Sequence, residues 1–241
     1  MRMDINCDMG EFPEAVADGS QEALMPYLTS VNIACGGHAG DADTMRRTVE
    51  QARRHGLARG AHPGYPDRAN FGRIELDMPL DAVAESVFEQ VSALAAIAGG
   101  LRHVKPHGAL YNQAARDAKL ARAIADGVAR YSRDLALMGL AGSVMLDVFR
   151  EAGFAVMAEA FADRRYEPDG SLRSRRHADA LIKDPEEAAE QAARIAEHGT
   201  VIAWNGTEVP LRADSICIHG DTPGALGIAR AVRTRLNECS L

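Results

Sequence analysis

Eight short stretches of the chain have the composition of β-strands, because they are rich in apolar residues and bounded by polar or glycine-containing segments. Most are continuous apolar runs that do not alternate with polar residues, a pattern typical of parallel strands buried on both faces. The predicted strands are residues 3–8, 30–35, 57–62, 102–107, 134–139, 154–161, 200–204 and 215–219.

Helical segments lie between these strands, and four of them have clear start signals. Helices are expected to begin near Asp41, Pro79, Asp184 and Thr222, because Asp and Thr side chains cap helix N-termini and proline favours the first turn. Apolar residues at three- and four-residue spacing predict the buried face of each helix. In three of the helices these residues are Met45, Val49 and Ala52; Leu80, Val83, Val87, Val91 and Leu94; and Leu226, Ala229, Val232 and Leu236.

The alternation of strands and helices predicts an α/β fold with a parallel sheet. We expect residues 1–241 to form one domain, a distorted (β/α) barrel of seven or eight parallel-type strands. An open, doubly wound sheet is the alternative architecture. Residues 163–183 are too long and irregular for an ordinary connection, so a functional loop or lid is expected there.

Composition and charge narrow the range of partners. The chain has 241 residues, 46% of them hydrophobic and 25% charged, which is the balance of a globular protein with a real core. Its formal net charge of -7 disfavours nucleic acid and anionic membrane surfaces as partners. No apolar stretch approaches the roughly 18 residues of a membrane span.

The N-terminal sequence and the cysteines favour a cytoplasmic protein. The chain begins without the apolar segment and cleavage site of a signal peptide, so export is not expected. Four cysteines are present without a CxxC pair: Cys7, Cys35, Cys217 and Cys239. We expect reduced thiols, because a core of this size needs no cross-links, although the even count also permits two disulfides.

Polar and ionisable residues gather where the predicted strands end. The carboxyl ends of parallel strands meet on one face of an α/β fold, and that face carries the active site. A single histidine at a strand end is more often a structural residue than a catalyst. Here the strand ends supply Asp8, Glu11, His38, Asp41, His62, Asp67, His107, Asn112, Glu159, Asp163, His219 and Asp221. This set predicts one functional site, without fixing the role of each member.

Lys105 lies inside a predicted strand and is unusual in this chain, which has only three lysines among its 27 basic residues. It is either a compact cation serving the site or a buried lysine paired with a carboxylate. Two-residue alternation places Lys105 and His107 on one strand face. The sequence contains no GxxxxGK[ST], GxGxxG, HExxH or GxSxG motif, so no standard nucleotide site, zincin helix or nucleophile elbow is indicated.

Taken in order, the strand-end motifs resemble the LamB/YcsF family, the A subunits of ATP-dependent 5-oxoprolinases. The motifs are Asn6-Cys7-Asp8-Met9-Gly10-Glu11, Cys35-Gly36-Gly37-His38-Ala39-Gly40-Asp41, Gly60-Ala61-His62-Pro63-Gly64-Tyr65, Lys105-Pro106-His107-Gly108-Ala109-Leu110-Tyr111-Asn112 and Ile218-His219-Gly220-Asp221. The resemblance implies opening of the 5-oxoproline lactam to glutamate, with ATP as co-substrate and two partner subunits, B and C. It also implies a barrel related to metal-dependent sugar deacetylases, whose metal is held by one Asp and two His.

Hydrolysis of an activated lactam needs a base for water, a stabiliser of negative charge and an acid for the departing nitrogen. By position and chemical type, Asp8 or Glu11 is the candidate base, Lys105 the charge stabiliser, and His107 or His62 the acid. The candidates for substrate binding are His38, His62, Arg73, Asn112, His219 and Asp221.

Two other functions remain open at this stage. The first is a metal-dependent deacetylase or amidase that works alone, with a divalent metal on Asp8, His62 and His107 and an open position for water. The second is a scaffold subunit without chemistry of its own. Metal analysis and assays with and without the partner subunits would separate these functions.

Overall fold

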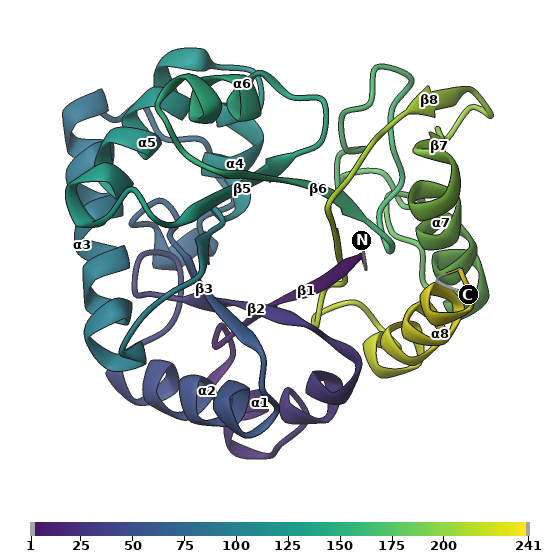
Figure 1. Ribbon diagram of the computed structural model, residues 1–241, viewed down its shortest axis with the longest axis horizontal. Helices are drawn as coiled ribbons and strands as arrows, with labels where there is room; N and C mark the ends of the chain where they lie inside the picture. The colour runs from purple at the N-terminus through teal and green to yellow at the C-terminus, as the bar shows by residue number, and fades with distance from the viewer. Residues whose placement is uncertain (1–2, 240–241) are drawn as a thin grey trace.

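The computed structural model describes residues 3–239, and its seven parallel strands close into a barrel surrounded by helices (Figure 1). Around the ring the order is β1, β2, β3, β4, β5, β6 and β9, so β9 lies between β6 and β1. The bounds are β1 Asp4–Met9, β2 Ser30–Ala34, β3 Ala58–His62, β4 His103–Val104, β5 Ala136–Leu140, β6 Val156–Phe161 and β9 Ser215–Cys217. The predicted barrel is confirmed, with seven strands.

The prediction that residues 200–204 form a barrel strand is wrong. Strand β7 (Thr200–Ile202) pairs antiparallel with β8 (Glu208–Pro210), and this hairpin lies outside the barrel beside α7 (Figure 1). Val201 is buried whereas Ile202 is exposed, so only one face of the strand is covered. The Asn205-Gly206 dipeptide between the two strands is a strong hairpin signal that the prediction did not use.

All four predicted helices are present, and Asp41 and Asp184 cap theirs as expected. The helix Leu80–Ala98 begins just after Pro79, and the helix Ala225–Glu238 begins after Gly224, without the predicted cap from Thr222. Asp41 caps α2 by accepting hydrogen bonds from the backbone N–H groups of Asp43 and Thr44. The helices are α1 Pro13–Ala17, α2 Ala42–Arg54, α3 Leu80–Ala98, α4 Gly108–Ala114, α5 Ala118–Tyr131, α6 Val144–Glu151, α7 Pro185–His198 and α8 Ala225–Glu238, with 3₁₀ turns at Glu22–Tyr27 and Arg68–Asn70. Around the barrel, α3 packs against α5 and α7 against α8 (Figure 1).

Two details of the helix predictions are wrong. Leu80 and Leu226 were assigned to buried helix faces, but their side chains are exposed because both lie in the first turn, beyond the edge of the barrel. The start signals also missed α1, α4, α5 and α6. Helix α5 has a start signal that the prediction did not use, because the Asp117 side chain accepts hydrogen bonds from the backbone N–H groups of Lys119 and Leu120.

Residues 163–183 form an irregular segment, as expected, held by two isolated bridges between Arg164 and Leu181 and between Tyr166 and Leu172. Tyr166 is fully buried, and its hydroxyl accepts a hydrogen bond from the Phe161 backbone N–H at 2.8 Å, so the segment is anchored to β6. All four cysteines are free thiols. Within residues 3–239 no helix combines the length and apolar character needed to cross a bilayer.

Candidate active site

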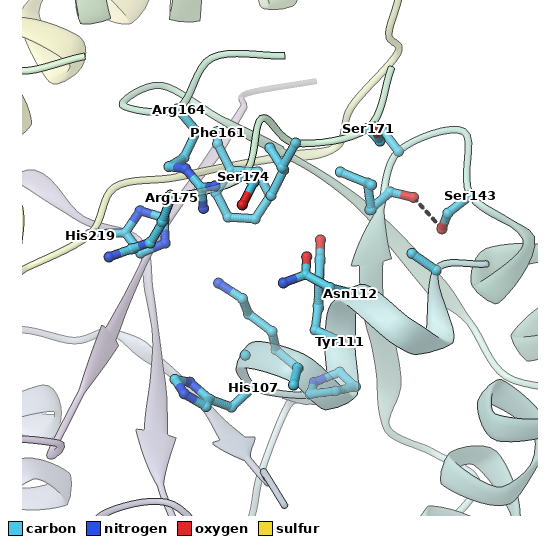
Figure 2. Close-up of a pocket in the computed structure, with 18 of the residues that line it drawn as sticks. His107, Tyr111, Asn112, Ser143, Phe161, Arg164, Ser171, Ser174, Arg175 and His219 are labelled. Atoms are coloured by element: carbon cyan, nitrogen blue, oxygen red, sulfur yellow. Dashed lines mark hydrogen bonds between the residues drawn. The ribbon is translucent and has the colours of Figure 1, made fainter. Parts of the chain in front are cut away.

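A cavity of about 940 Å³ lies at the carboxyl ends of the barrel strands, and Figure 2 shows side chains pointing into it from several of the loops that follow these strands. Segment 163–183 contributes much of its wall, together with the start of α4 and the residues after β5. A volume of this order is typical of small-molecule sites. The predicted site residues that line it are Asp8, Glu11, His62, Arg73, Lys105, His107, Asn112, His219 and Asp221.

Lys105 is an ammonium held between two carboxylates. Its Nζ lies 2.9 Å from Asp8 Oδ1, 2.8 Å from Glu159 Oε1 and 3.3 Å from Cys217 Sγ, and the side chain is buried. Burial acts to lower the pKa of Lys105, but the Asp8 carboxylate and the other anionic partners raise it well above the ordinary value. The amine is therefore charged, which makes it a stabiliser of negative charge and not a nucleophile.

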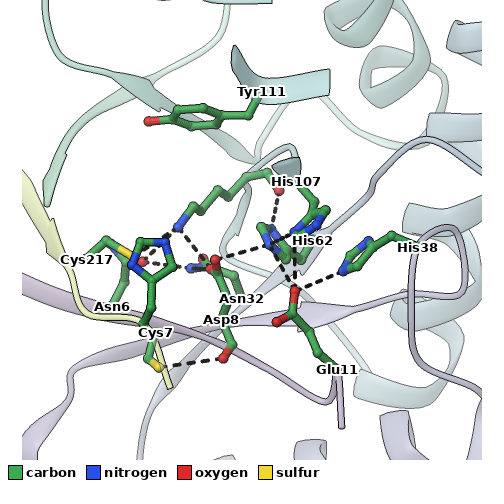
Figure 3. Close-up of polar contacts among 12 residues, drawn as sticks. Asn6, Cys7, Asp8, Glu11, Asn32, His38, His62, His107, Tyr111 and Cys217 are labelled. Atoms are coloured by element: carbon green, nitrogen blue, oxygen red, sulfur yellow. Dashed lines mark hydrogen bonds and ion pairs between the residues drawn. The ribbon is translucent and has the colours of Figure 1, made fainter. Parts of the chain in front are cut away.

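Asp8 is the carboxylate that links this lysine to the histidines (Figure 3). Its Oδ2 lies 3.3 Å from His62 Nε2, and its Oδ1 also accepts a hydrogen bond from Asn32 Nδ2 at 2.8 Å. Burial acts to raise the pKa of Asp8, but His62 and Lys105 together hold it well below its usual range. Asp8 is thus ionised at neutral pH and lies at the cavity wall, as a base requires.

Glu11 is surrounded by three imidazole rings. Its Oε1 lies 3.0 Å from His38 Nε2, 3.2 Å from His107 Nδ1 and 3.8 Å from His62 Nε2 (Figure 3). His107 Nδ1 is also 3.0 Å from His62 Nε2. Burial acts to raise the pKa of Glu11, but its hydrogen bonds with His107 and His38 lower it.

The outer nitrogens of two of these rings fix which nitrogens carry hydrogen. His62 Nδ1 donates to the Lys105 carbonyl at 2.8 Å, and His107 Nε2 donates to the Phe71 carbonyl at 2.9 Å, since a carbonyl only accepts. In the neutral rings, His62 Nε2 and His107 Nδ1 therefore carry lone pairs and no hydrogen, and these two atoms face each other and Glu11. Such converging acceptors need a shared proton or a cation between them.

His38 lies behind this group and not at the cavity. It is 1% exposed, and its ring stacks on that of His107 with 3.6 Å between centroids. The expectation that His38 contacts substrate is therefore not matched by its position. Close packing here requires glycine, because a Cβ on Gly64 would lie 2.6 Å from His38 Nδ1 and one on Gly72 would lie 2.7 Å from His38 Cβ.

His219 is oriented by a fully buried carboxylate. Asp163 Oδ1 accepts from His219 Nδ1 at 2.8 Å, while Oδ2 accepts from the His219 backbone N–H and from the Thr222 hydroxyl. Burial acts to raise the pKa of Asp163, but the hydrogen-bonded His219 lowers it. Because Nδ1 is engaged, Nε2 is the ring nitrogen left for a bound molecule.

Three further predicted residues lie at the rim of the cavity. Arg73 Nη2 lies 2.8 Å from Asp221 Oδ2, and Arg175 Nη1 lies 3.3 Å from the same oxygen. Asn112, from α4, points into the cavity from the side of Tyr111 (Figure 2). The structure therefore brings most of the predicted acids and histidines together on one face, with His38 set behind the others. Asp41 and Asp67, also expected there, cap helical turns and do not line the cavity.

Comparison with known proteins fixes the family. The sequence profile of the LamB/YcsF family matches residues 3–241. The chain belongs to the LamB/YcsF family. It is 53% identical to the A subunit of 5-oxoprolinase from Chloroflexus aggregans, over 100% of this chain and 97% of that protein. It is 48% identical to the corresponding 5-oxoprolinase chain of Bordetella pertussis, over 98% and 95% of the two chains.

Solved structures agree with this assignment. The lactam utilization protein of Thermus thermophilus has a TM-score of 0.92 and 43% identity, covering 100% of this chain and 98% of that one. A putative cellobiose-phosphate cleavage protein of Enterococcus faecalis has a TM-score of 0.58 at 16% identity, over 99% and 94% of the chains, so it shares the fold alone.

In this LamB/YcsF chain, one cluster of side chains has the composition and spacing of a metal site, but its members differ from the predicted ligands. Glu11, His38, His62 and His107 offer ligand atoms that all lie within 4.8 Å of one another, whereas Asp8 groups with Cys217 and His219. In a tetrahedral site with nitrogen ligands at about 2.0–2.1 Å, neighbouring ligand atoms are about 3.3 Å apart. The separations of 3.0, 3.2 and 3.8 Å around Glu11 Oε1 are of this size.

Several polar residues of the site were given no catalytic or binding role from sequence, although Glu159 was placed at a strand end. Tyr111 donates a hydrogen bond to Glu159 Oε2 at 2.8 Å, and Glu159 is the second partner of Lys105. Asn32 receives a hydrogen bond from His103 and donates to Asn6, so it holds the Asp8 carboxylate in place. A signal existed for Glu159: a glutamate within an apolar strand needs a buried cation, and Lys105 is the matching residue.

Proposed function

We propose that this chain is the A subunit of a 5-oxoprolinase, a hydrolase that opens the lactam of 5-oxo-L-proline to glutamate, and that residues 1–241 act as one domain. The observation that carries the proposal is the ionised Asp8 carboxylate between Lys105 and His62 at the wall of a small-molecule cavity. The names of the relatives at up to 53% identity support the choice of substrate.

The chemistry explains why such an enzyme consumes ATP. A lactam is an amide whose resonance, reflected in a rotation barrier of about 18–20 kcal/mol, makes its carbonyl a poor electrophile. Transfer of the γ-phosphoryl group of ATP to the lactam oxygen activates the ring carbon and releases ADP. Water adds there, cleavage of the C–N bond leaves an acyl phosphate, and a second water converts it to glutamate and phosphate.

Partner subunits complete the proposal. The sequence has no phosphate-binding glycine motif, so we assign ATP binding to the assembled enzyme and not to this chain alone. The proposed partners are subunits B and C. The proposed location of the assembly is the cytoplasm. The cavity of this chain then holds the hydrolytic half of the reaction.

Three side chains are assigned roles in that half. Asp8 takes the proton from the attacking water, because it is ionised and faces the cavity. The Lys105 ammonium stabilises the negative charge that develops on the oxygens of the tetrahedral intermediate.

His219 is the proton donor to the leaving nitrogen, since Asp163 orients it and leaves Nε2 for the substrate. His107, the acid expected from sequence, has both ring nitrogens engaged by Glu11, His62 and Phe71.

A divalent metal is the second element of the proposal. Glu11, His62 and His107, with His38 behind them, would hold it, and the backbone carbonyls on the outer nitrogens would orient the rings. A bound divalent ion supplies a Lewis acid and lowers the pKa of coordinated water. This cluster is also the observation that favours the alternative of a metal-dependent amidase working alone.

The deciding experiment compares the chain alone with the chain plus subunits B and C, using 5-oxoproline and ATP and measuring glutamate and phosphate. Glutamate is expected only from the three-subunit mixture, in a one-to-one ratio with phosphate. Full turnover by the chain alone would favour the self-contained amidase. Equal turnover by subunits B and C without this chain would contradict a catalytic role.

A further inference from the structure

Arg164 is a buried cation that the proposed chemistry has not used. It lies in the first turn of segment 163–183, lines the cavity and is only 7% exposed. Its Nη2 donates to the Arg173 carbonyl at 2.8 Å, whereas its Nε is buried and finds no hydrogen-bond partner within residues 3–239. Over the same residues no carboxylate forms an ion pair with it. A buried guanidinium is normally paired, because leaving it without a counter-charge is strongly destabilising.

A second guanidinium makes the charge imbalance larger. Arg175 lies near Arg164, and burial together with the positive charge of Arg175 lowers the pKa of Arg164 to about 10, which still leaves it protonated at neutral pH. Arg175 shares its carboxylate partner, Asp221, with Arg73. Three guanidiniums therefore line this side of the cavity, and Asp221 pairs with two of them. The Asp163 carboxylate acts favourably on Arg164 but is hydrogen-bonded to His219 and Thr222.

The position of these groups suits a bound molecule and not a surface ion pair. Figure 2 shows Arg164, Ser174 and Arg175 around Phe161 and His219, on the opposite side of the cavity from His107. A molecule reacting between Asp8 and His219 would thus present one end to the His–Glu cluster and another to the guanidiniums. Planar guanidinium forks match the two oxygens of a carboxylate and the oxygens of a phosphoryl group.

We propose that Arg164 and Arg175, with the Ser174 hydroxyl, form an oxyanion subsite that binds the acidic group of the reacting molecule. The inference rests on the proposed function, in which two groups have this chemistry: the carboxylate of 5-oxoproline and the phosphoryl group of the activated lactam. Binding there supplies an anionic hydrogen-bond partner for the Arg164 guanidinium, whose Nε has none within residues 3–239.

The experiment measures dissociation constants by calorimetry on the full chain with three probes. These are 5-oxoproline, the neutral lactam 2-pyrrolidinone, which lacks the carboxylate, and inorganic phosphate. The variants are Arg164→Met, which removes the charge at similar length, Arg164→Lys, which keeps it, and Arg175→Met. Arg116→Met is the matched control, because Arg116 lines the same cavity but is exposed and already paired with Glu75.

Arg164→Met is expected to weaken binding of at least one anion by roughly 10- to 100-fold, the loss expected for a charged hydrogen bond. Affinity for 2-pyrrolidinone should not change, Arg164→Lys should retain part of the anion affinity, and Arg116→Met should bind as the wild type does. A loss confined to 5-oxoproline identifies the carboxylate as the bound group, and a loss confined to phosphate identifies the phosphoryl group.

The proposal is overturned if both anions bind Arg164→Met as tightly as wild type, if the neutral lactam loses affinity equally, or if wild type binds neither anion. Should Arg164→Met fail to fold, Arg164→Lys and Arg175→Met decide by the same criteria. Failure of the proposed function has a different signature: arginine-dependent anion binding without glutamate release by the three-subunit mixture.

Discussion

Replacing Lys105 by Met tests the charge balance at the centre of the barrel. Methionine keeps nearly the length of the lysine side chain but removes the ammonium that lies 2.9 Å from Asp8 Oδ1 and 2.8 Å from Glu159 Oε1. Two buried carboxylates would then face each other across an apolar side chain. The substitution therefore exchanges two attractive contacts for one repulsive pair.

The size of the effect follows from these contacts. Two unit charges at about 4 Å interact by about 4 kcal/mol at an effective dielectric constant of about 20. The attraction lost at the two contacts therefore exceeds the desolvation energy that is recovered when the ammonium is removed. Removing one partner of a buried ion pair costs about 3–5 kcal/mol. We expect a loss of that order in the free energy of unfolding. The double variant Lys105→Met/Glu159→Gln should recover about 1–3 kcal/mol, because one of the stranded charges is removed.

Urea denaturation followed by circular dichroism measures both values. Lys119→Met, the same change at an exposed lysine on α5, is the control and should stay within about 0.5 kcal/mol of wild type. If Lys105→Met were as stable as this control, or if Glu159→Gln added a further loss, Lys105 would not be the cation that holds the two carboxylates.

Three further predictions concern the reaction. Asp8→Asn should lower glutamate release by the three-subunit enzyme by about 10²–10⁴-fold in protein that circular dichroism shows to be folded; near-normal turnover would make Asp8 a structural residue. Asp163→Asn should lower kcat by about 10²-fold with little change in KM, because it removes the charge that supports the His219 imidazolium; an unchanged kcat–pH profile would argue against His219 as the acid. Metal-free chain titrated with Zn²⁺ should bind one ion, and His107→Ala should abolish this binding; a titration without heat would remove the metal from the proposal.

The sequence was sufficient to predict the barrel because the signals for its strands and helices are local. Apolar runs and caps such as Asp41 act within a few residues, and the runs located all seven barrel strands. The hairpin at residues 200–210 was missed because strand propensity does not say which partner a strand takes. Helix α5 was missed although Asp117 caps it, and its place in the fold is set by packing against α3, which the local sequence does not reveal.

For the candidate site, the position of a residue along the chain predicted whether it belongs to the site, but it did not predict which residues it contacts there. Strand-end placement brought most of the predicted site residues to the wall of one cavity, since parallel strands bring their carboxyl ends together. It could not predict that His38 stacks behind His107, because that depends on the glycines at positions 64 and 72. Nor could it single out Arg164 among the 27 basic residues, since only the three-dimensional structure shows that its Nε has no hydrogen-bond partner within residues 3–239.

The place of β9 in the ring sets an order of events on the ribosome. Strand β9 pairs with both β1 and β6, and it is synthesised after every other barrel strand. Until residues 215–217 emerge, β1 and β6 have open edges that other chains can pair with. Asn6 then lacks the Ser215 hydroxyl, to which it donates at 2.8 Å, and Lys105 lacks the Cys217 thiol. Contacts of such long sequence separation form slowly. Protection from aggregation and completion of the candidate site therefore arrive in one step, when the nascent chain closes its ring.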